Sequence, residues 1–164
     1  MKKLFIMAIA AMAFAACGGG GSSSNVEPLK EGVKFEMDNF SIMLPTGMEE
    51  SYKSGDVLNA RCDDGAKFVI NHFTGGPTKS QLKTTGEGLK GMVHAWDQSA
   101  VSEEPVVDGN MVTLKSKIGD NVRYDFTYLK EDKVGVTGNF EFPADKAAQF
   151  EDKFLPILKS VVFK

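Results

Sequence analysis

The chain contains 164 residues, of which 42% are apolar and 25% are charged. This composition fits one globular domain and excludes a chain that is disordered throughout. The formal net charge of −3 leaves no basic excess to neutralise phosphates, which argues against a nucleic-acid-binding protein.

The first 16 residues have the pattern of a signal peptide. Lys2 and Lys3 precede an apolar run over residues 4–14, which as a helix would be roughly 16 Å long. The hydrocarbon core of a bilayer is about 30 Å thick, so this run is too short to span a membrane. We therefore interpret it as the hydrophobic region of a secretory signal peptide.

A cysteine with small neighbours follows the apolar run. The segment Ala15-Ala16-Cys17-Gly18 resembles the lipobox of bacterial lipoproteins, although Phe14 stands where that family usually has Leu, Val or Ile. The resemblance implies cleavage between Ala16 and Cys17, a diacylglycerol on the Cys17 thiol and acylation of its amino group. The alternative is an ordinary secretory signal followed by an incidental cysteine.

Residues 17–32 are predicted to be a flexible tether, because glycines and serines fill positions 18–24 and cannot bury a core. In the best-known sorting rule for lipoproteins, an aspartate after the lipidated cysteine retains the protein at the inner membrane. Gly18 at that position favours the outer membrane, and the lack of an acidic cluster in the tether favours its periplasmic face. The sequence thus predicts a cell-envelope lipoprotein held at the membrane through Cys17.

The folded domain is predicted over residues 33–164. Alternating apolar and polar residues predict two hairpins in its first part, with strands over residues 34–37, 40–44, 56–62 and 67–73. Thr78 can cap a helix over residues 78–96, although Gly86, Gly88 and Gly91 each weaken it by about 1 kcal/mol relative to alanine.

Further strands are predicted at regular spacing, which is typical of an antiparallel meander. They cover residues 99–107, 111–118, 122–129 and 134–142. A helix over residues 144–162 closes the chain, and Pro156 is expected to kink it or to start a new turn. The element order predicts an α+β domain in which helices pack on a central antiparallel sheet.

Two short motifs resemble the PsbP/Mog1-like domains. The opening is Phe40-Ser41-Ile42-Met43-Leu44-Pro45, with Gly47 and with Met48 in place of the usual aromatic residue, and the close is Pro143 followed by Leu158-Lys159-Ser160-Val161. The resemblance covers about residues 35–163 and implies an α/β/α sandwich. Characterised members are binding or assembly factors, so it also implies a protein that is not an enzyme, and no functional residue can be carried over.

A glycine pattern in the predicted helix imitates a nucleotide-binding fingerprint. Residues 86–93, Gly-Glu-Gly-Leu-Lys-Gly-Met-Val, match GxGxxGxV. That chemistry requires a buried strand ending at the first glycine, whereas residues 79–85 are polar and helix-like. We therefore interpret the pattern as a helix that packs closely on the sheet.

Few other side chains are candidates for chemistry. Cys62 alternates with apolar residues and is predicted to be a buried structural thiol rather than a nucleophile. His72 and His94 fall on separate elements and lack an identifiable carboxylate partner, so no metal or other cofactor is predicted. Trp96, with Met92 and His94 nearby, either anchors the core or lines a ligand pocket.

These observations favour a non-enzymatic binding or assembly module for an unknown envelope protein partner. The alternatives are a carrier of a small apolar ligand bound between sheet and helix, and an envelope enzyme that uses Cys62 or a histidine. A cavity beside Trp96 would favour the carrier, whereas Cys62 within hydrogen-bond reach of His72 or His94 would favour the enzyme.

Overall fold

The computed structural model describes residues 26–164. The predicted signal peptide over residues 1–16, Cys17 and the glycine-rich part of the tether lie outside the described residues. Within residues 26–164, no helix has both the length and the apolar character needed to cross a bilayer.

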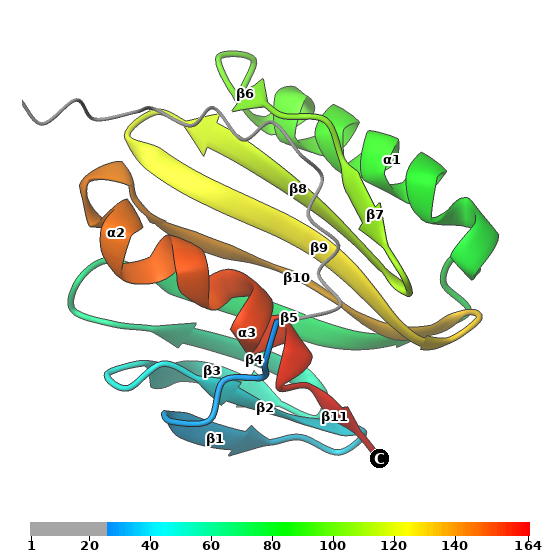
Figure 1. Cartoon of the computed structure of the whole chain (residues 1–164), viewed down its shortest axis with the longest axis horizontal. Coiled ribbons are helices and arrows are strands. Elements are labelled where there is room, and N and C mark those ends of the chain that lie inside the picture. The colour runs from blue at the N-terminus through cyan, green and yellow to red at the C-terminus, as the bar shows by residue number, and fades with distance from the viewer. Residues whose placement is uncertain (1–25) are drawn as a thin grey trace, which may run out of the picture.

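Two open antiparallel sheets form the framework (Figure 1). The larger sheet has eight strands, in the spatial order β3 (Glu49–Ser54), β4 (Val57–Arg61), β5 (Lys67–Thr74), β10 (Val134–Pro143), β9 (Asn121–Glu131), β8 (Met111–Ile118) and β6 (Val101–Ser102), with β7 (Val106–Asp108) also paired to β8. The smaller sheet has the order β1 (Val33–Glu36), β2 (Phe40–Leu44) and β11 (Val162–Phe163).

Helices cover both faces of the larger sheet (Figure 1). On one face lies α1 (Leu82–Trp96), which follows the 3-10 turn η2 (Lys79–Gln81). The other face carries the closing segment, made of η3 (Ala144–Lys146), α2 (Ala147–Phe150), η4 (Glu151–Lys153) and α3 (Phe154–Lys159). The described chain begins beside α3, where the backbone N–H of Leu29 donates to the carbonyl of Pro156 (2.9 Å).

The main core lies between the larger sheet, the smaller sheet and the closing helices. Phenylalanines dominate it, and their rings form a connected cluster with centroids 5.1–6.1 Å apart, within the range of favourable aromatic pairs: Phe68, Phe126, Phe140, Phe142, Phe150 and Phe154. The face under α1 holds two smaller clusters, built around Leu82 and around Leu89 with Val93. The larger part of the hydrophobic stabilisation of the fold therefore comes from the face of the sheet opposite α1.

Most predicted elements are present, and the helix over 78–96 is confirmed. The Gln81 side chain accepts a hydrogen bond from the Thr78 N–H (2.9 Å), which fixes the start of that helical segment. The strand predicted over residues 99–107 is instead two short strands, β6 and β7, because the chain between them leaves the sheet at Pro105. The edge strand β3 was not predicted.

The closing helix predicted over residues 144–162 is not continuous, and of the two effects expected of Pro156 the start of a new helical turn is confirmed. It is interrupted by η4 and restarts at Phe154, so that Pro156 lies in the first turn of α3. Proline has no N–H and its ring clashes with the carbonyl four residues earlier, whereas neither matters in a first turn. The proline therefore sets where the second helix begins.

Candidate functional site

A groove lies between α1 and the open part of the larger sheet. Its volume is about 490 Å³, within the usual range for small-molecule sites. Its lining comes from β5, β9 and β10, from α1 and from the segment that leads into α1: Phe73, Pro77, Thr85, Gly88, Leu89, Met92, Thr127 and Thr137. These side chains are apolar or carry a hydroxyl, and none of them is charged.

Two glycines of α1 shape the helix side of this groove. A Cβ atom at Gly86 would lie 2.6 Å from the Cβ of Pro105 and 2.9 Å from a methyl carbon of Val112, so only glycine permits the observed approach of helix and sheet. A Cβ atom at Gly88 would meet no heavy atom within 4 Å. The missing side chain of Gly88 therefore leaves space in the groove wall.

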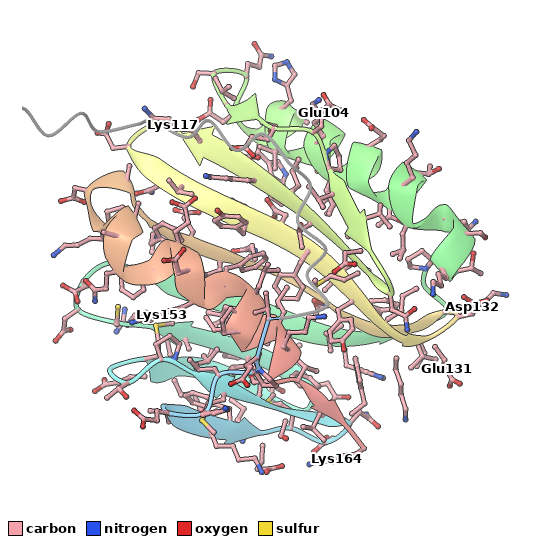
Figure 2. All side chains as sticks on the ribbon, in the orientation of Figure 1. Glu104, Lys117, Glu131, Asp132, Lys153 and Lys164 are labelled. Atoms are coloured by element: carbon pink, nitrogen blue, oxygen red, sulfur yellow. The ribbon has the colours of Figure 1, made fainter. Side chains whose placement is uncertain are left out.

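The turn between β9 and β10 fixes the end of the groove at which Pro77 lies. The backbone N–H of Lys133 donates to the Pro77 carbonyl, and its carbonyl accepts from the Gly76 N–H, at 3.0 Å each. Asp132, which lies at the outer rim in Figure 2, accepts a hydrogen bond from the Lys79 N–H (2.7 Å). These bonds hold the segment before α1 against the turn, so Pro77 forms a fixed end wall.

A pair of threonines on adjacent strands forms part of the groove floor. Thr127 and Thr137 are register partners in β9 and β10, and their hydroxyl oxygens lie 3.3 Å apart. The Thr137 hydroxyl donates to the Phe126 carbonyl (2.8 Å). On the helix wall, the Thr85 hydroxyl donates to the Gln81 carbonyl (3.0 Å).

A charged cluster near the C-terminal end of α1 ties the helix to the sheet. The Arg123 guanidinium forms a bidentate pair with Asp125 (2.7–3.1 Å) and lies 5.1 Å from the centre of the Trp96 ring. Asp125 is only 4% exposed, and burial raises its pKa, although the hydrogen bonds from Arg123 oppose that shift. The cluster is a structural contact that positions the helix end.

The structure separates the three residues that were predicted to lie together near the helix end. Met92 lines the groove and is 46% exposed. Trp96 and His94 do not line it, and Trp96 is 65% exposed. The expectation that Trp96 anchors the core is therefore wrong, since cation–π contact with Arg123 holds it at the surface.

The candidate catalytic residues are not assembled into a site. Cys62 is half-buried beside the main core, directly after β4. Arg61, the residue before Cys62, pairs with Lys67 of the adjacent strand β5. His72 lies five residues further along β5 from Lys67, which at about 3.4 Å per residue separates it from this pair by roughly 17 Å. His94 is on α1, across the sheet from the main core.

His72 instead belongs to a local contact with a carboxylate. Its Nδ1 lies 3.6 Å from an Asp56 oxygen. Burial alone would raise the pKa of Asp56, but hydrogen bonds from the Asn39 side chain and backbone N–H, together with nearby His72, outweigh burial and lower it. Across residues 26–164, no group of three or more His, Cys, Asp or Glu side chains could hold a metal ion.

Sequence reasoning identified Met92 but missed most of the groove. The floor threonines become neighbours only through the pairing of β9 with β10, which residue spacing does not specify. The sequence indicated that Gly88 weakens the helix, but not that its missing side chain leaves space in the groove wall.

Comparison with known proteins establishes the fold. No protein family matches the chain, and no curated protein sequence matches it. The solution structure of cyanobacterial PsbP (CyanoP) from Synechocystis sp. PCC 6803 is similar with a TM-score of 0.53 and 15% identity, covering 92% of this chain and 99% of that one. The chain therefore has a PsbP-like α+β fold, as the motifs in the sequence implied.

This chain is also similar to part of a second, longer protein of known structure. A crystal structure from Bacteroides thetaiotaomicron matches with a TM-score of 0.50 and 16% identity, over 81% of this chain. The chain spans about half of that protein, since 48% of it is covered. At these identities the likeness establishes the fold and leaves function to the site.

Proposed function

We propose that this protein is a non-catalytic binding module of the bacterial cell envelope, anchored by a lipid on Cys17, and that it binds its partner in the groove under α1. One observation carries the proposal. The groove combines apolar walls with three hydroxyl groups and has no titratable side chain in its lining. Such a lining suits binding, because acid–base or nucleophilic catalysis needs a titratable or activated group in the site.

The positions of the reactive side chains support a binding role. Cys62 and His72 lie on or beside the main core, on the opposite face of the larger sheet from the groove. An enzyme based on Cys62 would need a base within about 3 Å of the thiol. The PsbP-like fold is consistent with this role, since the resemblance in the sequence is to binding and assembly factors.

The membrane anchor is the second part of the proposal and rests on the residues around Cys17. Acyl chains contribute about 0.8 kcal/mol for each buried methylene, and two or more chains give stable anchoring. Gly18 favours placement in the outer membrane, and the lack of an acidic cluster in the tether favours its periplasmic face. Replacing Cys17 with serine should release the protein from the membrane fraction, and intact mass should show acyl chains on the wild type only. A wild type without acyl mass would refute the anchor.

Site-directed photocrosslinking in living cells tests the binding site. A photoreactive residue in place of Met92 lies on the groove, whereas one in place of His94 lies on the same helix but outside it. We expect an adduct from position 92 that is lost when Gly88 is also changed to leucine. Equal crosslinking from both positions, or an adduct that is insensitive to Gly88→Leu, would refute the groove as the site.

The groove also favours the second candidate function, the carrier of a small apolar ligand. Its volume is that of a small-molecule site. A stable protein partner would also need contacts outside the groove, because such interfaces bury about 800 Å² on each partner. The mass of the crosslinked adduct separates the two candidates. A gain of a few hundred daltons indicates a small ligand, and a gain of protein size indicates an assembly partner.

A further inference from the structure

We propose that the groove selects a neutral, largely apolar small molecule that carries a hydrogen-bond donor, and that Thr127 and Thr137 accept this bond. The inference rests on the groove proposed above as the binding site and on the second candidate function, the carrier of a small ligand. The directions of the protons of the groove hydroxyls indicate the chemical class of that ligand.

The two threonines on the groove floor form a pair. A threonine hydroxyl has one proton to donate and two lone pairs that accept. The Thr137 proton is directed to the Phe126 carbonyl, because a carbonyl can only accept. In the contact between the two hydroxyls, which is long at 3.3 Å, only Thr127 can then donate. While these two bonds are kept, neither hydroxyl has a proton left for a ligand, and both keep a free lone pair.

The helix wall repeats this arrangement. The Thr85 proton is directed to the Gln81 carbonyl, so this hydroxyl also faces a ligand only as an acceptor. The remaining lining side chains have no polar hydrogen: Phe73, Pro77, Gly88, Leu89 and Met92. All polar side-chain atoms of the groove lining are thus acceptors whose own protons are already used.

A ligand must complement these acceptors to bind well. A buried acceptor that loses water without gaining a donor carries the desolvation penalty of that group. Thr127 is 3% exposed, so a ligand over the floor would exclude the little water that can reach its oxygen. A ligand that supplies an N–H or O–H replaces the hydrogen bond from water to the threonine oxygen. A ligand that presents an oxygen instead places its lone pairs against those of the threonine, which is repulsive.

The walls define the rest of the ligand. No charged side chain lines the groove, so a charged group placed against Phe73, Leu89 and Met92 would lose hydration without an ionic partner. An aromatic ring, in contrast, can stack on Phe73 and contact the Met92 sulfur. The fitting class is therefore a neutral molecule with an apolar, preferably aromatic, body and one donor.

Two probes of equal shape test the requirement for a donor. Indole has a ring N–H, and benzofuran has the same outline with an oxygen in its place. Binding is followed by amide chemical shifts during titration of the chain from residue 17 with Cys17→Ser, which keeps every described strand, helix and core residue. We expect both probes to shift groove amides, and indole to bind on the order of 3- to 10-fold more tightly, the usual effect of one neutral hydrogen bond.

Variants assign the bond to the floor. In the double variant Thr127→Val/Thr137→Val, whose side chains keep their shape and lose the hydroxyls, the preference for indole should disappear. The preference should survive in Thr85→Val and in Thr84→Val, the latter an exposed control one position away. Dispersed amide spectra of each variant confirm folding.

Each outcome decides between the claims. Equal affinity for the two probes in the wild type would overturn the donor requirement, and loss of preference in Thr85→Val alone would overturn the assignment to the floor. Neither result would affect the crosslinking from position 92, so failure of this inference is distinguishable from failure of the groove as a binding site. Binding of both probes that is unaffected by Gly88→Leu would overturn both.

Discussion

Alanine substitutions at Gly86 and Gly88 should change the stability of the domain in opposite directions. Both glycines lie inside α1, where replacing glycine with alanine gains about 0.8–1.0 kcal/mol of helix propensity. At Gly88 the new methyl group meets nothing within 4 Å, so the whole gain should appear in the free energy of unfolding.

At Gly86 the same methyl group would collide with the sheet side of the interface. Its contacts of 2.6 Å and 2.9 Å are with the ring of Pro105 and with Val112 of β8, neither of which is a flexible chain end. Overpacking of this kind costs about 1–3 kcal/mol, which exceeds the propensity gain. We expect a net loss of about 1 kcal/mol, and a difference of about 2 kcal/mol between the two variants.

Urea denaturation measures this difference. With a slope of about 1–3 kcal/mol per molar urea, the two midpoints should be separated by about 1 M, with unchanged slopes. Gly91→Ala, also open at its Cβ, is the matched control and should behave as Gly88→Ala does. If Gly86→Ala is as stabilising as Gly88→Ala, the close approach of α1 to the sheet is refuted.

Three further predictions follow from individual contacts. Gly138→Ala places a Cβ atom 1.9 Å from the Val69 carbonyl oxygen between two central strands and should cost about 3 kcal/mol or more in urea unfolding; a cost below 1 kcal/mol would contradict this. Trp96→Ala should cost about 0.5–1 kcal/mol, the value of a surface cation–π contact with Arg123, and a loss typical of a core tryptophan, about 3–5 kcal/mol, would contradict the exposed position. Asp56 has a lowered pKa in the folded state, so its contribution is present above the ordinary aspartate value of about 3.9 and is lost as pH falls through the folded value. The stability difference between wild type and Asp56→Ala should therefore shrink as the pH falls below about 4; a difference that does not shrink there would contradict it.

Strands whose residues alternate between two environments were predictable from the sequence. The limits predicted for β8, residues 111–118, agree with the structure because its residues alternate between the main core and the α1 side. The edge strand β3 was missed because all its residues are exposed. Its sequence therefore lacks the alternation of apolar and polar residues that a buried face produces. Such a strand is defined by its pairing with β4, which is not a local property.

The candidate site was less predictable, since it depends on contacts between distant segments. Met92 could be proposed from its position on the helix, but its neighbours Phe73 and Thr137 come from strands far away in sequence. Trp96 was misjudged because helical spacing places it near the apolar stripe, whereas Arg123 in β9 holds the ring at the surface. Helix periodicity identifies an apolar face and does not specify where the helix stops covering the sheet.

The position at which the described chain begins has a consequence for how the proposed anchored protein would work. That position is beside α3, and the groove is under α1, so the larger sheet is a partition between the attachment side and the binding side. In the anchored protein proposed above, the attachment would then lie on the face of the larger sheet opposite the groove, and a bound molecule would not have to displace it. Reach and affinity would then be independent properties: the length of the tether sets how far the domain extends, and the groove alone sets what it carries.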